Sequence, residues 1–286
     1  MSRGLLLALC MASAPIAAPA AAAAFQPTRI SVAVRGTGPD VILIPGLAAS
    51  RGIWSSTVAA VPGYRYHLVQ VAGFAGTAMG GNTDGPVAAP VADEIARYIS
   101  ARRLDRPAIV GHSMGGSIAI MVAARHPDAT GRVMVVDMLP SAARPFGLPA
   151  PVMKPIASVI GDEMQRASRF LRGLEPLAAR FGGVDWLKSR SDAGVVARSV
   201  KELLATDLTP ELRRIRAPLT VVYACSARFR YACAQVTRVY GRAYARRPGT
   251  RLVRIEDSGH TIMWDQPGAF QGALRAFLAG RQPAGK

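Results

Sequence analysis

The sequence predicts an α/β protein with a mainly parallel central sheet, helices on both faces of that sheet and a helical cap insertion. Short apolar runs alternate with helical patterns along most of the chain, and such alternation is typical of parallel strands joined by helices. The run GRVMVVDM contains four successive apolar residues, Val133 to Val136, as expected for a strand buried on both faces. Residues 141–206 carry helical patterns without an intervening strand, which predicts the insertion.

The predicted elements alternate along the chain on either side of this insertion. In the first predicted helix, Val91, Ile95 and Ile99 fall on one side, as the helical period requires for a buried face. The predicted strands are 28–36, 40–46, 64–73, 106–113, 131–138, 218–224 and 250–257. The predicted helices are 91–104, 114–126, 235–246 and 267–279, with 163–181 and 195–205 inside the insertion.

The first 24 residues are typical of a secretory signal peptide. Arg3 precedes a long charge-free run rich in leucine and alanine that ends in small residues. Its strongly apolar part covers about ten residues and is followed by Pro15 and Pro19, whereas a membrane span needs about twenty. The sequence therefore predicts cleavage after residue 24, a periplasmic or secreted protein, and no stable membrane span once the leader is removed.

The chain is strongly basic. The full sequence has a formal net charge of +17, and removal of the leader, whose only charged residue is Arg3, leaves +16 (17 − 1). The arginines are scattered rather than clustered, and no nucleic-acid-binding motif accompanies them. We expect a solvated basic surface and no nucleic-acid partner; the sequence carries no signal for an oligomeric state.

Two cysteines, Cys225 and Cys233, remain outside the leader. In an exported protein, a pair eight positions apart predicts a disulfide that closes a small loop. The alternative is a pair of free thiols. Neither the cysteines nor the four histidines have the spacing of metal ligands, and the sequence predicts neither a metal nor an organic cofactor.

The motif Gly111-His112-Ser113-Met114-Gly115-Gly116 carries the strongest chemical signal. It joins a predicted strand to a predicted helix, and a serine in such a sharp turn is exposed above the sheet as a nucleophile. Glycines on both sides are needed because side chains there would collide with neighbouring backbone.

With this motif the sequence resembles the α/β-hydrolase fold superfamily, in particular its serine esterase, lipase and haloperoxidase-like branch. The resemblance covers residues 40–278, and its landmarks occur in order: VILIPGLAAS, IWSSTV, YHLVQVAGFAG, GHSMGG, IRAPLTVVYA and EDSGHTIMWDQP. It implies that Ser113 is the nucleophile and that His260, between the last strand and the last helix, is the base. It further implies an oxyanion hole made by the backbone N–H groups of Leu47 and Met114. The implied domains are a core of 25–140 and 207–286 and a cap of 141–206.

The sequence departs from this family at three positions. Pro45 stands where a histidine is common, and Gln70 stands where an aspartate usually supports a turn. The position of the usual catalytic carboxylate falls on or near Ala227, and the chain has no Asp or Glu between Leu212 and Ile255. The acid expected to orient the histidine therefore has to come from elsewhere or is missing.

Three readings of the acid remain open. Asp137, at the end of the strand GRVMVVDM, is the first, because some superfamily members carry their acid after this strand. Asp257, three residues before His260, is the second. In the third, the protein uses only serine and histidine, or is not catalytic.

The predicted function is hydrolysis of small carboxylic esters through an acyl-enzyme intermediate. An apolar pocket in the cap is expected from Met153, Ile156, Ile160 and Phe170. The alternatives are a cofactor-free haloperoxidase or perhydrolase, a hydrolase of carbon–carbon bonds, and a catalytically impaired binding protein of the same fold.

Overall fold

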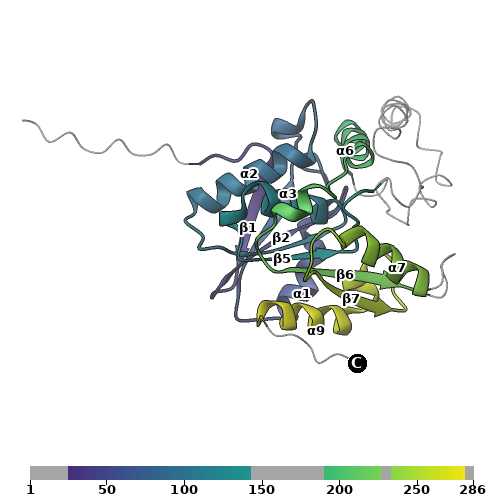
Figure 1. Ribbon diagram of the computed structural model, residues 1–286. Helices are drawn as coiled ribbons and strands as arrows, with labels where there is room; N and C mark the ends of the chain where they lie inside the picture. The colour runs from purple at the N-terminus through teal and green to yellow at the C-terminus, as the bar shows by residue number, and fades with distance from the viewer. Residues whose placement is uncertain (1–24, 143–189, 227–232, 281–286) are drawn as a thin grey trace, which may run out of the picture.

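The computed structural model describes residues 25–142, 190–226 and 233–280. A seven-stranded sheet forms the centre of this part of the molecule (Figure 1). Its strand order is β1-β3-β2-β4-β5-β6-β7, with β1 antiparallel to β3 and every other pair parallel. The predicted α/β fold with a mainly parallel sheet is therefore confirmed. The strands are β1 (Ile30–Arg35), β2 (Asp40–Ile44), β3 (Arg65–Val71), β4 (Ala108–His112), β5 (Arg132–Val136), β6 (Leu219–Cys225) and β7 (Arg251–Glu256).

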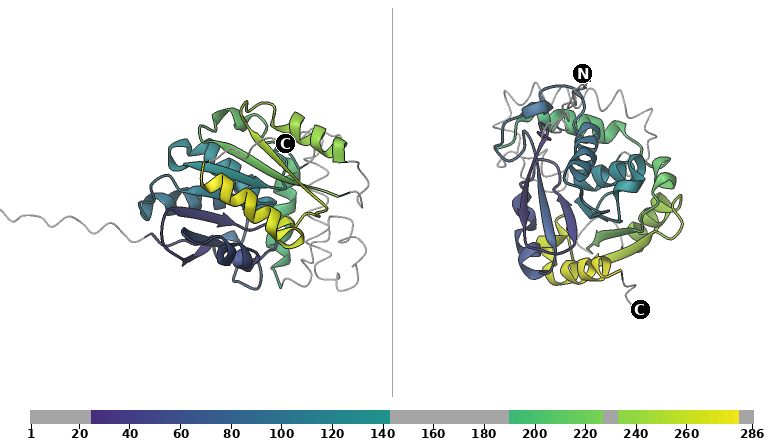
Figure 2. Two further views of the ribbon diagram at one scale, coloured as in Figure 1. Left: turned by 90° about the horizontal axis from the view of Figure 1, so that it is seen from below. Right: turned by 90° about the vertical axis from the view of Figure 1, so that its left-hand side faces the viewer.

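Helices cover both faces of this sheet (Figure 2). Helices α2 and α3 pack on one face, and α1 and α9 on the other. The described helices are α1 (Ser55–Ala60), α2 (Ala88–Ala101), α3 (Met114–Arg125), α6 (Ala193–Ala205), α7 (Cys233–Tyr244), α8 (Ile262–Asp265) and α9 (Pro267–Leu278). Short 3₁₀ helices lie at η1 (Arg51–Trp54), η2 (Gly80–Asn82), η3 (Pro127–Ala129) and η6 (Glu211–Arg214).

The apolar strands divide their side chains between two cores. Ile42 and Ile44 belong to the core beneath α2 and α3, whereas Val41 and Leu43 belong to the core that contains Phe270 of α9. Successive strand residues point to opposite faces of the sheet. These four β2 side chains and Phe270 are each at most 1% exposed. Burial of such a side chain contributes about 1.5–3 kcal/mol, so continuous apolar runs are stable only in a sheet covered on both sides.

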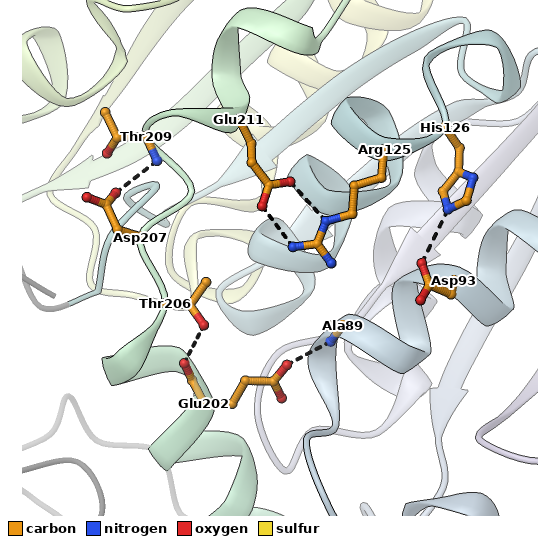
Figure 3. A network of polar contacts seen from close by, with 9 residues as sticks. All are labelled: Ala89, Asp93, Arg125, His126, Glu202, Thr206, Asp207, Thr209 and Glu211. Carbon is orange, nitrogen blue, oxygen red and sulfur yellow. Dashed lines mark hydrogen bonds and ion pairs between the residues drawn. The ribbon is translucent and has the colours of Figure 1, made fainter. Parts of the chain in front are cut away.

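Helix α6 lies in the predicted cap and is docked on the core. Val195 lies against Gly73, at the turn after β3. The Glu202 carboxylate accepts hydrogen bonds of 2.6, 2.6 and 2.8 Å from the backbone N–H groups of residues 87–89. Figure 3 shows the last of these, from Ala89. These N–H groups include free donors at the amino end of α2. Because the capping group comes from a distant segment, α2 begins at residue 88 rather than at the predicted 91.

Some predicted segments lie outside the described residues. These are the leader (1–24) and residues 143–189 of the cap, which include the residues expected to form its apolar pocket.

The sequence does not predict helices α1 and α8, because their six and four residues are too few to show a clear helical period. Among the residues that the structure describes, no helix has the length and apolar character needed to cross a bilayer.

Candidate active site

Ser113 lies in the sharp turn between β4 and α3. Its backbone angles are φ +54° and ψ −123°, a conformation that costs a non-glycine residue about 1–3 kcal/mol and persists only where the surroundings enforce it. The residue is half-buried and follows the carboxyl end of a parallel strand. The turn therefore places Ser113 at the edge of the sheet where α/β proteins bind their ligands.

Glycines on both sides make this turn possible. A Cβ on Gly111 would overlap the backbone carbonyl of Gly115, and a Cβ on Gly115 would overlap the carbonyl oxygens of Ile44 and Pro45. Backbone thus packs directly on backbone where α3 meets β4 and the loop after β2. The glycines predicted to be necessary are required by these contacts.

The loop after β2 adjoins the turn at Ser113. A Cβ on Gly46 would lie 3.1 Å from the Ser113 Cβ, so the two backbones approach closely. Leu47 follows in this loop and is half-buried, and Met114 is the first residue of α3. The structure therefore brings both predicted oxyanion residues to the neighbourhood of Ser113, and the free N–H groups at the start of a helix favour negative charge there.

Gln70 has a structural role that the sequence did not reveal. Its buried side chain accepts a 2.9 Å hydrogen bond from the backbone N–H of Arg51 and donates hydrogen bonds of 3.3 Å to the carbonyls of Ala49 and Phe74. An ionised carboxylate could only accept. The amide therefore ties the loop after β2 to the turn after β3 in a way that an aspartate could not.

His260 lies in the loop between β7 and α8, and its ring contacts Asp137. The Nδ1 atom is 2.7 Å from Asp137 Oδ2, although 123 residues separate the two in sequence. The His260 ring centroid is 4.7 Å from that of His112, the residue before Ser113. The structure thus brings Ser113, His260 and Asp137 into one region.

Asp137 is held on both of its carboxylate oxygens. It follows β5 with φ +49°, and its backbone N–H donates a 2.7 Å hydrogen bond to the carbonyl of Val222. While Oδ2 faces His260, Oδ1 accepts hydrogen bonds from the Ala224 N–H at 3.0 Å and the Tyr240 hydroxyl at 2.9 Å. Three donors therefore converge on this carboxylate and fix its orientation.

His112 supports the loop that carries His260. Its Nε2 lies 2.9 Å from the carbonyl oxygen of His260, and because that oxygen only accepts, Nε2 carries the proton. Burial, reinforced by the nearby imidazole of His260, lowers the pKa of His112 to about 3. His112 is therefore a neutral, fixed imidazole, and its Nδ1 has no hydrogen-bond partner among the residues that the structure describes.

The second candidate acid is placed differently. Asp257 is exposed, and its backbone carbonyl accepts a 3.1 Å hydrogen bond from the Gln266 side chain. In the described residues it makes no recorded contact with His260. The geometry therefore favours Asp137 over Asp257 as the partner of the histidine.

Comparison with known proteins identifies the family of the chain. Residues 41–272 match the Alpha/beta hydrolase family. The chain belongs to this family. It is similar to a pimeloyl-[acyl-carrier protein] methyl ester esterase from Aeromonas hydrophila, with 24% identity over 87% of this chain and 99% of that protein. It is also similar to an N-formylmaleamate deformylase from Pseudomonas putida, with 26% identity over 85% of this chain and 90% of that protein.

A solved structure supports the fold of this alpha/beta hydrolase. That of a thermophilic esterase from Thermogutta terrifontis superposes with a TM-score of 0.67, covering 88% of this chain and 93% of the esterase at 20% identity. At this identity the likeness supports the fold alone.

The two cysteines of the hydrolase lie beside the site. Cys225, the last residue of β6, and Cys233, the first of α7, form a disulfide with Cα atoms 5.4 Å apart, within the usual range. Residues 227–232, between the two cysteines, lie outside the described residues, and they include Ala227, the position of the usual family acid. Within the part of the chain that the structure describes, no three His, Cys, Asp or Glu side chains gather as a metal site would require.

Proposed function

We propose that this hydrolase cleaves carboxylic esters of small molecules through an acyl-enzyme intermediate on Ser113. The contact between His260 Nδ1 and Asp137 Oδ2 carries the proposal, because it supplies an oriented base beside a strained serine turn. The relative from Aeromonas hydrophila is named as a methyl ester esterase, which also supports an ester substrate.

The proposed chemistry has two stages. The Ser113 hydroxyl oxygen forms a bond to the acyl carbon while His260 takes its proton at Nε2, since Nδ1 is occupied by Asp137. The backbone N–H groups of Leu47 and Met114 hold the oxyanion, and the proton then goes to the departing alcohol as the ester bond breaks. Water adds to the acyl-enzyme by the same route and releases the acid.

Asp137 serves this cycle in two ways. Its carboxylate keeps the Nδ1 proton of His260 in place, which leaves Nε2 free to accept the proton from serine. It also stabilises the imidazolium formed in each stage.

Covalent labelling tests the nucleophile. A fluorophosphonate probe is expected to modify the folded protein once, and peptide mass spectrometry should place the adduct on Ser113. The Ser113→Ala variant, which removes only the hydroxyl, should remain unlabelled while melting at the same temperature. A folded wild-type protein that resists the probe would contradict the enzyme proposal and favour a binding protein of this fold.

We further propose that the protein is exported to the periplasm or secreted. The leader pattern of residues 1–24 and the disulfide between Cys225 and Cys233 support this, because such bonds persist in oxidising compartments. Amino-terminal sequencing of protein recovered from the periplasm or medium of an expressing bacterium should begin at Phe25. Retention of Met1 on protein found only in the cytoplasmic fraction would contradict it.

A further inference from the structure

Helix α7 supplies a side chain that reaches the candidate acid. The Tyr240 hydroxyl lies 2.9 Å from Asp137 Oδ1. The same oxygen accepts the N–H of Ala224 at 3.0 Å, and the other oxygen faces His260. Tyr240 is therefore the only side chain besides His260 with a recorded hydrogen bond to this carboxylate among the described residues.

The tyrosine ring has little freedom to move. It is buried, and it stacks on Tyr223 of β6 with centroids 4.4 Å apart and an angle of 16° between the rings. Tyr223 in turn contacts α7 through its hydroxyl, 3.1 Å from Thr237 Oγ1. The disulfide joins the start of α7 to the end of β6, two helical turns before Tyr240. The hydroxyl is thus presented to Asp137 by two elements that are tied together.

The hydroxyl acts as a donor at any pH at which the protein is assayed. Burial, and then the charge of Asp137, raise the pKa of Tyr240 well above its ordinary value. The phenol therefore stays protonated and its proton points to the carboxylate, which has only lone pairs to offer.

Asp137 needs such support because of its position. The residue extends from the end of β5 with a left-handed backbone, and the last side-chain torsion of an aspartate has no sharply preferred angle of its own. Donors on Oδ1 resist rotation of the carboxylate and keep Oδ2 against His260. Of the two donors, the Ala224 N–H belongs to the backbone, and the Tyr240 hydroxyl can be removed by mutation.

We propose that Tyr240 is a positioning residue that holds the Asp137 carboxylate in the orientation that serves His260. The inference rests on the proposed ester hydrolysis. A purely structural tyrosine would contribute to folding stability and leave turnover unchanged, so the two roles differ in what they predict for kcat.

The matched pair of variants is Tyr240→Phe and Tyr244→Phe. Both remove one buried hydroxyl from α7, but the Tyr244 hydroxyl donates to the backbone carbonyl of Met138 at 2.6 Å rather than to the carboxylate. Phenylalanine retains the ring and its packing. Thermal melting of both variants measures the loss of stability, and turnover of a p-nitrophenyl ester well below the melting temperature measures positioning.

For Tyr240→Phe we expect a fall in kcat of about tenfold, typical of a lost hydrogen bond to a charged group, with KM within about twofold of wild type. The acidic limb of the kcat/KM profile should move to lower pH, because a carboxylate that is held less well stabilises the imidazolium of His260 less. Asp137→Asn should move it in the same direction. Tyr244→Phe should keep the wild-type kcat and profile.

Two outcomes separate the inference from the proposed function. Wild-type kcat and pH profile in Tyr240→Phe, together with a large loss in Asp137→Asn, would overturn the positioning role and leave the acid intact. Wild-type turnover in Asp137→Asn would overturn the acid itself and the positioning role with it. The downfield proton resonance of His260 Nδ1 gives a readout without turnover, and it should shift in Tyr240→Phe but not in Tyr244→Phe.

Discussion

Replacement of Asp137 with asparagine is expected to lower kcat for ester hydrolysis by roughly 10⁴-fold, as the equivalent change does in a serine protease. The carboxylate accepts from three donors, at His260 Nδ1, Ala224 N and Tyr240 Oη. An asparagine offers only one oxygen. If that oxygen serves Ala224 and Tyr240, the amide NH₂ points at His260 and forces Nδ1 to accept. The proton then moves to Nε2, and the imidazole can no longer take the proton from serine.

The control for this prediction is Asp257→Asn, the same chemical change at the exposed candidate acid. We expect its kcat to stay within about twofold of wild type, since in the described part of the chain no hydrogen bond or ion pair joins Asp257 to the histidine. Initial rates with a p-nitrophenyl ester, and melting curves for both variants, provide the comparison. Equal loss in the two variants, or full activity in Asp137→Asn, would show that Asp137 is not the acid.

Replacement of Gly111 with alanine is expected to cost about 3 kcal/mol or more of folding stability, the upper range for forced overpacking. The added Cβ would overlap the carbonyl of Gly115 and lie 2.7 Å from the backbone nitrogen of Gly116. Because these atoms belong to the backbone of α3, the helix itself has to move away from β4. The displacement would also disturb the turn at Ser113, so turnover should fall together with stability.

A second glycine provides the matched control. Gly272, in the exposed part of α9, has no atom within 4 Å of an added Cβ, and Gly272→Ala should stabilise the helix by roughly 0.5–1 kcal/mol. Thermal melting of both variants should give shifts of opposite sign. A Gly111→Ala protein that melts like wild type would contradict the close backbone packing at the turn.

The strands and the serine turn could be predicted from sequence because they follow local rules. Runs such as residues 131–138 place apolar side chains on both faces of the strand. Only a sheet with helices on both of its faces buries both sets. The glycines around Ser113 likewise indicate a backbone that tolerates no side chain. Each signal lies within a few residues of the feature that it predicts.

Features that depend on distant segments could not be predicted in the same way. Helix α2 begins three residues early because Glu202, more than a hundred positions later, caps its free N–H groups. Gln70 stands where the family usually has an acid, yet its amide joins two loops through hydrogen bonds that require both a donor and an acceptor. In each case the partner is defined by the folded chain and not by the neighbouring sequence.

The candidate active site likewise combines residues that the sequence indicates with a contact that only the folded chain defines. The glycine-flanked turn predicted Ser113 as a nucleophile, and the resemblance to the family implied His260 as the base and an empty acid position near Ala227. The sequence left Asp137 and Asp257 both open. Only the tertiary structure places Asp137 against His260 and Tyr240 against Asp137, because contacts between residues more than a hundred positions apart depend on how strands and helices pack, and a local pattern carries no information about that packing.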